Sequence, residues 1–90
     1  MATISSDILA SYAADAAREV EGVRGVRRKG VRIEEDDGRL RVELHLEVEW
    51  GASIPAVGRE VQRRVARYLG QMAKVSPAAV DVVVDEIAPP

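Results

Sequence analysis

The residues most suggestive of chemistry lie between Glu21 and Gly30, in the run EGVRGVRRKG. The segment Gly22-Val23-Arg24-Gly25 is a G-x-x-G motif, and a basic run follows it directly. In some RNA-binding folds, a G-x-x-G loop clamps the backbone of several nucleotides. The cations available for such a phosphate clamp are Arg24, Arg27, Arg28 and Lys29. A small nucleic-acid-binding module is therefore one hypothesis for this chain.

The context of the motif favours a structural role for its glycines. The known clamp joins two helices, whereas the pattern here predicts a helix before the motif and a strand after it. The net charge of −2 also differs from the basic character of most nucleic-acid-binding domains. Aromatic side chains for base stacking are few, because Tyr12, Tyr68 and Trp50 are predicted on the inner sides of their elements. We therefore favour a structural role over a nucleic-acid partner, and we assign Gly22 to a helix end and Gly25 to a bend.

His45 is the single histidine of the chain, and it lies between Glu43 and Glu47 on the outward side of a predicted strand. Carboxylates on the same face can raise the pKa of a histidine. A metal site built from these three residues has poor geometry, because side chains two positions apart on a strand splay. The chain has no cysteine, which excludes disulfides and thiolate metal sites. We predict an ordinary surface histidine, with no metal site and no cofactor.

The sequence contains none of the common motifs of catalysis. It has no nucleophile–base pair, no P-loop and no dinucleotide-binding fingerprint, so we assign no catalytic residues and expect a protein that is not an enzyme. No apolar run approaches the roughly 20 residues that a membrane span requires. The first residues lack the basic and apolar regions of a signal peptide. These features predict a cytoplasmic protein.

Two rows of charged residues are candidates for binding a partner. One row lies on a predicted second helix and consists of Arg59, Arg63, Arg64 and Arg67. The other row lies on the outward side of a predicted strand and consists of Glu43, Glu47 and Glu49. The first predicted helix is acidic, and an acidic and a basic helix on one domain could support head-to-tail self-association. A helix face that is simply solvated remains the alternative for the arginines.

Hydrophobic periodicity predicts the helices that carry these residues. Apolar residues at steps of three and four predict a first helix, with the stripe Ile4, Ile8, Leu9, Tyr12, Ala13, Ala16, Ala17 and Val20. The same spacing predicts a second helix, with the stripe Ile54, Val57, Val61, Val65, Tyr68, Leu69 and Met72. Ser5 or Ser6 can cap the first helix and Ser53 the second, and Ser76-Pro77 should end the second helix.

Strict alternation from Leu40 to Trp50 predicts a long strand. A two-residue turn at Asp37-Gly38 would pair it with the preceding segment, so that Ile33 faces Val42 on the inner side. A valine-rich strand over residues 80–87 should run parallel to the long strand after a right-handed crossover. The expected fold is a two-layer α+β arrangement in the order α-β-β-α-β, a three-stranded mixed sheet with two helices on one face. Residues 1–90 form one domain, with a core from about 4 to 87 and a tail from 88 to 90.

Three runs of the sequence resemble the alkaline shock protein family of bacteria, also called the general stress protein family. These runs are ISSDILASYAADAAREVEGVRGV, GVRIEEDDGRLRVELHLEVEWGASIPAVGREVQRRVARYLGQM and VDVVVDEI. Within them, V-E-G-V at Val20–Val23, an aromatic-glycine pair at Trp50-Gly51 and Q-x-x-V at Gln62–Val65 occur in the family's order. The resemblance extends from about Ile4 to Ile87, and tryptophan stands at position 50 where the family usually has tyrosine.

The resemblance implies a non-enzymatic protein of bacterial stress response and cell-envelope homeostasis. Some relatives self-associate and are tethered beneath the cytoplasmic membrane by a membrane-spanning partner. The resemblance supplies no catalytic residue and no cofactor. We therefore predict an interaction or scaffold module that forms homo-oligomers or docks on a membrane-anchored protein, with the nucleic-acid-binding module as the alternative.

Overall fold

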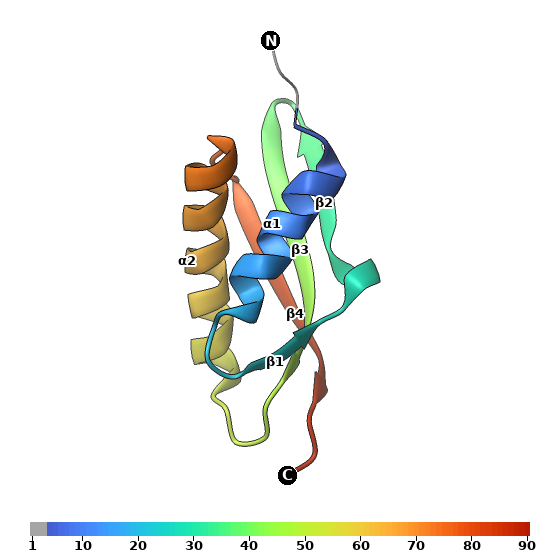
Figure 1. The fold of residues 1–90 in the computed structure, drawn as a ribbon, viewed down its shortest axis with the longest axis vertical. Coiled ribbons are helices and arrows are strands. Elements are labelled where there is room, and N and C mark those ends of the chain that lie inside the picture. Colours follow the sequence, from blue (N-terminus) through green and yellow to red (C-terminus); the bar gives the residue numbers. More distant parts are fainter. Residues whose placement is uncertain (1–3) are drawn as a thin grey trace.

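Two helices cover one face of a mixed four-stranded sheet in the computed structural model (Figure 1). The structure describes residues 4–90, apart from the side chain of Arg28. The elements in chain order are α1 (Ser6–Arg18), β1 (Val23–Val26), the 3₁₀ turn η1 (Arg28–Gly30), β2 (Arg32–Asp36), β3 (Arg39–Val48), α2 (Ile54–Ala73) and β4 (Ala79–Ile87). The predicted α+β class and the placement of both helices on one face are confirmed.

Strand β3 is the centre of the sheet and pairs with all three other strands. Strands β1 and β2 both run antiparallel to β3, whereas β4 runs parallel to it. β1 pairs with the end of β3 and β2 with its beginning, so the two follow each other along one edge. The prediction of three strands is therefore one short, because it missed β1 and assigned Gly25 to a bend. Together, β1 and β2 make one interrupted edge strand.

The interruption of this edge strand follows from its register. Arg27 donates its backbone N–H to the carbonyl of His45 at 3.0 Å, and Arg32 lies opposite Glu43. Four residues separate Arg27 from Arg32, whereas only Leu44 separates their two partners on β3. The additional residues leave the ladder and form η1, as in a large β-bulge.

The hairpin between β2 and β3 has the register that the sequence predicts. Ile33 lies opposite Val42, and Asp36 and Arg39 form the last pair before the turn. The two turn residues, Asp37 and Gly38, have φ angles of 51° and 74°. Two successive left-handed residues are the signature of a type I′ turn, whose twist matches that of the strands. Turn chemistry and side-chain alternation therefore specify the same pairing.

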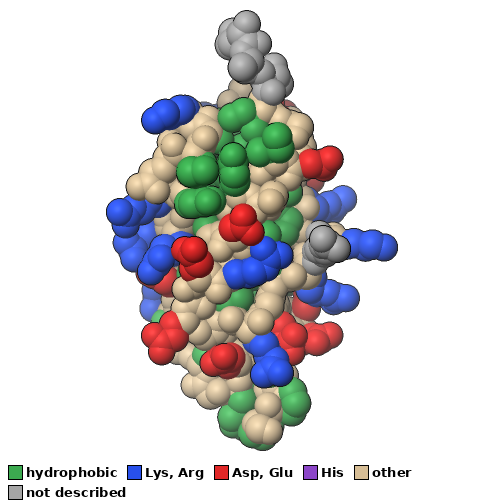
Figure 2. Space-filling view, in the orientation of Figure 1, with side chains coloured by type: hydrophobic (Ala, Val, Ile, Leu, Met, Phe, Trp, Pro, Cys, Tyr) green, Lys and Arg blue, Asp and Glu red, His purple; other side chains and the backbone are tan. Residues whose placement is uncertain are grey.

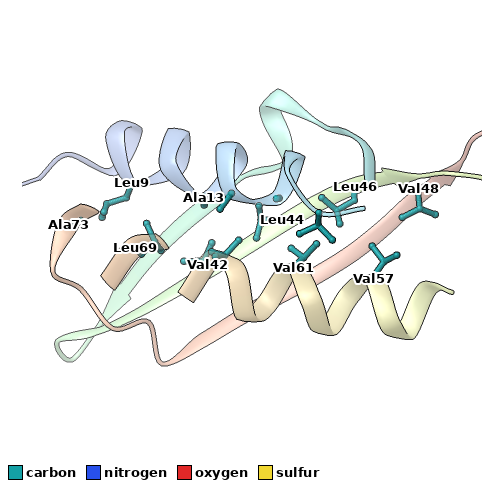
Figure 3. Packing of buried hydrophobic residues seen from close by; sticks show 14 residues of the cluster. Leu9, Ala13, Val42, Leu44, Leu46, Val48, Val57, Val61, Leu69 and Ala73 are labelled. Atoms are coloured by element: carbon teal, nitrogen blue, oxygen red, sulfur yellow. The ribbon is translucent and has the colours of Figure 1, made fainter. Parts of the chain in front are cut away.

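The core lies between the inner face of the sheet and the two helices (Figure 3). The inward residues of β3 are Val42, Leu44, Leu46 and Val48, and all four are fully buried. Val61, Val65 and Leu69 of α2 are also fully buried against this face. Helix α1 contributes small residues instead, with Ala13 and Ala17 fully buried, so it can approach the other elements closely.

The predicted apolar stripes are wider than the core that forms. The predicted buried stripes include Ile4, Ile8, Ile54 and Met72. In the structure, between 36% and 48% of the surface of each of these residues is exposed. All four lie near helix ends, since Ile4 precedes α1, Ile8 lies in its first turn, and Ile54 and Met72 lie in the first and last turns of α2. The prediction that Trp50 faces inward is wrong, because its side chain is 65% exposed. Strand β3 ends at Val48, so the alternation no longer fixes the direction of that ring.

Three predicted boundaries also shift. Helix α1 ends at Arg18, and Gly22 lies in the turn before β1 rather than at the helix end. Helix α2 ends at Ala73, before Ser76-Pro77, because Lys74 adopts the left-handed conformation at φ 58°. Ala88, assigned to the tail, is only 2% exposed and donates its N–H to the carbonyl of Val48 at 2.8 Å.

Candidate functional site

The outer face of the sheet, opposite the helices, carries a polar cluster around His45. Nδ1 of His45 lies 3.0 Å from each carboxylate oxygen of Asp85, and Nε2 lies 3.1 Å from Oε2 of Glu43. Arg27 donates from Nη1 to Oδ2 of Asp85 at 3.3 Å. The cluster joins three parts of the sheet, because β3 supplies His45 and Glu43, β4 supplies Asp85, and Arg27 directly follows β1.

These contacts favour the charged form of each group. The hydrogen bond to Asp85, followed by the bond to Glu43, raises the pKa of His45 above its ordinary value of 6.5. The bond to His45 in turn lowers the pKa of Asp85, and the Arg27 guanidinium adds to this effect. A shallow open hollow lies over the cluster, and Lys29 and Arg32 line it together with the residues above.

The sequence pattern predicts His45 and Glu43 on one face of the sheet but does not predict that Asp85 contacts them. The third residue of the predicted trio, Glu47, instead faces Arg24, with Arg24 Nε 3.9 Å from its Oε1. Over the residues that the structure describes, no group of three or more His, Asp or Glu side chains has the arrangement to hold a metal ion. Alternation along β4 puts Asp85 on the outer face, which is a detectable signal, but its distance from His45 depends on the β3–β4 register.

The G-x-x-G motif does not form a loop. Val23–Val26 is strand β1, and two of the proposed phosphate-binding cations are held by carboxylates, Arg24 by Glu47 and Arg27 by Asp85. Lys29 is exposed in η1, and the side chain of Arg28 lies outside the described residues. A backbone clamp requires a loop between two helices, and this segment does not have that geometry.

All four predicted arginines of α2 are exposed, but they fall into two groups. Glu60 accepts from Arg63 at 2.6 and 3.1 Å and from Arg64 at 3.0 Å. These hydrogen bonds, that of Arg63 first, lower the pKa of Glu60 to about 2. Within residues 4–90, no carboxylate lies within ion-pair distance of Arg59 or Arg67. The cationic ridge is thus partly neutralised by its own helix.

The seam between the helices carries a hydrophobic surface that sequence reasoning missed. Tyr12 of α1 and Tyr68 of α2 meet edge to face, with their ring centroids 5.8 Å apart. Ile8 lies one turn before Tyr12 and Met72 one turn after Tyr68, so in an antiparallel helix pair both lie toward the same end. We call Ile4, Ile8 and Met72 the helix-seam patch, since 36%, 47% and 48% of their respective surfaces are exposed.

A second hydrophobic surface lies at the opposite end of the molecule. Trp50, Ile54 and Ile87 are 65%, 38% and 50% exposed, and we call them the Trp50 patch. The three residues share this end because β3, β4 and the start of α2 all reach it, with Ile87 opposite Val48. Figure 2 shows hydrophobic side chains gathered over the start of α1 and a second group at the far end.

A comparison with models of protein families identifies the family of this chain. Residues 24–89 match the alkaline shock protein 23 family, which is described as having a cell envelope-related function. The chain belongs to this family. The match includes the whole sheet except Val23, and it confirms the resemblance drawn from the sequence motifs. A comparison with curated proteins gives no significant match.

Solved structures of MamM CTD have a similar fold. A histidine-to-alanine variant aligns with a TM-score of 0.65 at 16% identity, covering 94% of this chain and 100% of that chain. A manganese form has a TM-score of 0.62 at 18% identity, with 91% and 99% covered. A cadmium form has the same score and identity, with 91% and 98% covered. At these identities the likeness concerns the fold.

In residues 4–90, neither helix has the length and apolar character needed to cross a bilayer.

Proposed function

We propose that this domain is a non-enzymatic interaction module of bacterial envelope stress, which self-associates or docks on a membrane-anchored protein. The observation that carries the proposal is the presence of exposed apolar side chains at both ends of one elongated domain. The domain measures 48 × 21 × 20 Å, and the helix-seam patch and the Trp50 patch lie at opposite ends of its long axis (Figure 2). The family's cell envelope-related function is consistent with this role.

The apolar patches supply a driving force for association. Covering apolar surface is favourable by roughly 25 cal/mol per Å², and contiguous exposed patches commonly mark interaction sites. The Trp50 patch has the features of an interface centre, since an exposed indole is flanked by polar residues. Glu21, Glu49 and Glu60 line a hollow beside Trp50, so the rim of this patch is acidic.

The charged rows contribute to the choice of partner rather than to most of the binding affinity. Glu43 and Glu47 already contact His45 and Arg24, so Glu49 is the member of the predicted glutamate row best placed for a partner. On α2, Arg59 and Arg67 are the arginines that an acidic partner would meet without displacing Glu60. The proposed module would act in the cytoplasm and reach the membrane through its partner.

Two patch variants and one matched control test the proposal. Trp50→Ser removes the centre of one patch, and the double variant Ile8→Ser with Met72→Ser removes the other. Val83→Ser is the control, because Val83 is 37% exposed on the outer face of the sheet and belongs to neither patch. Circular dichroism would first verify that each variant is folded.

The measurements are particle mass by light scattering and capture of membrane proteins from the native host. We expect at least one patch variant to lose mass or to lose a captured protein that the wild type and Val83→Ser both retain. Equal mass and equal capture for all four proteins would overturn the proposal. A loss that is as large in Val83→Ser as in the patch variants would also overturn it.

A further inference from the structure

We propose that His45 is a proton-dependent latch that ties the edge strand β4 and the turn η1 to the central strand β3. The latch consists of His45, Asp85, Glu43 and Arg27 on the outer face of the sheet. It is independent of the proposed interaction function, because it concerns how the fold responds to pH.

The hydrogen-bond geometry favours a doubly protonated ring. Both ring nitrogens of His45 face carboxylate oxygens, Asp85 at Nδ1 and Glu43 at Nε2. An ionised carboxylate can only accept, so each nitrogen must donate. A neutral imidazole carries one N–H, and its second nitrogen would turn a lone pair toward an anionic oxygen. The imidazolium form satisfies both contacts at once.

The latch lies at an interruption of the backbone pairing. The β3–β4 ladder has a register shift between Leu46 and Glu47, next to the position where Asp85 meets His45. In the described part of the chain, β4 pairs with β3 alone, so side-chain contacts matter most at this interruption. On the other edge, η1 folds against the histidine, since a Cβ added to Gly30 would lie 2.6 Å from Cβ of His45. His45 thus lies beside two irregular parts of the sheet, the β3–β4 register shift and η1.

The charged groups around the His45 ring have opposing effects on the stability of the imidazolium. The neighbouring cations are Arg27 after β1, Lys29 in η1 and Arg32 in β2. The neighbouring carboxylates are Glu43 and Glu47 in β3 and Asp81 and Asp85 in β4. The cations disfavour the imidazolium, but Arg27 is itself bonded to Asp85. Direct hydrogen bonds at 3.0 and 3.1 Å to His45 outweigh these more distant charges.

The direction of the pH response follows from the raised pKa of His45. A group whose pKa is higher in the folded state stabilises the fold fully below its unfolded pKa, near 6.5. This contribution is lost as the pH rises through the folded pKa. The lowered pKa of Asp85 sets the other limit, because its contribution is lost as the pH falls through that value. The latch is therefore closed between the lowered pKa of Asp85 and the raised pKa of His45, and it opens as the pH rises through the latter.

The first experiment is an NMR titration of the ring nitrogens in the full chain without an added tag. Only one histidine is present, so its ¹⁵N signals need no assignment among several. We expect the titration midpoint to lie above 6.5, so that more than half of the molecules carry both ring protons at pH 6.5. Asp85→Asn and Glu43→Gln should each lower the midpoint, whereas Glu49→Gln, on an exposed neighbour outside the cluster, should leave it unchanged. A wild-type midpoint at or below 6.5, or no change in Asp85→Asn, would overturn the latch.

The second experiment measures whether the strands respond. Amide hydrogen exchange would be followed at both ends of β4 on either side of the midpoint, after correction for intrinsic rates. We expect protection near Asp85–Ala88 to fall at higher pH in the wild type and to be insensitive to the same pH change in His45→Gln. If His45→Gln fails to fold, Asp85→Asn replaces it with the same expectation. An equal change in wild type and variant would show that His45 is not the responsible group.

Discussion

Gly22 and Gly25 are equivalent members of one motif in the sequence, but the structure gives them different roles. Gly22 has a φ angle of +96°, and a Cβ on it would lie 2.8 Å from Cγ2 of Val57. Gly25 lies in β1, where an added Cβ would meet no atom within 4 Å. The G-x-x-G spacing therefore combines one glycine that the turn requires with one that the strand tolerates.

We predict that Gly22→Ala destabilises the domain by about 1–3 kcal/mol, because the new side chain meets both a left-handed backbone and a close neighbour. Gly25→Ala should change stability by less than about 0.5 kcal/mol, since it has neither problem. Urea unfolding monitored by circular dichroism would measure both values. Similar values for the two variants would contradict this account of the turn before β1.

The two faces of β3 illustrate how one element divides stability from surface chemistry. Its inward residues are fully buried under the helices, whereas its outward residues form the polar rows and the latch around His45. The hairpin fixes this division, because a slip of one residue would exchange the two faces. The pairing of Ile33 with Val42 is thus the reason that His45 points away from the core.

We expect Leu44→Ala to lower the free energy of unfolding by about 2–5 kcal/mol, since Leu44 is fully buried at the centre of this face. Val83→Ala, on the opposite face of the neighbouring strand, should cost less than about 1 kcal/mol because Val83 is 37% exposed. Chemical denaturation gives both numbers. A small effect at Leu44 would mean that the two layers do not share one core.

The shape of the whole molecule decides how copies could join. The long axis of 48 Å is more than twice either short axis, and the two exposed apolar patches lie toward its two ends. Contacts that use two different ends of each copy are heterologous and extend a chain of molecules, whereas contacts between identical patches close a pair. Both kinds place the new contact at an end of the domain.

Small-angle scattering provides a test at this scale. If the protein self-associates through its apolar ends, the longest dimension should grow with concentration from its value at high dilution, while the cross-section stays constant. Trp50→Ser or the double variant of Ile8 and Met72 should reduce this growth. Assemblies that thicken without lengthening would show that the sides of the domain, including the α2 arginines, form the contact instead.

Local patterns were sufficient for the fold class, the two helices, the hairpin and most of the core. Each of these depends on neighbours in the chain: the alternation of β3, the Asp37-Gly38 turn and the helical spacing of Val61, Val65 and Leu69. The family resemblance also lay in short runs and was confirmed by the family match.

The remaining features depend on how distant segments are placed. Asp85 meets His45 across 40 positions of sequence, and only the parallel register of β4 with its bulge brings them together. The exposure of Ile8, Met72 and Trp50 likewise depends on where the facing layer ends, which hydrophobicity alone does not specify. Sequence by itself determined which residues prefer the interior, and the tertiary structure decided which of them the limited area of a small sheet could cover.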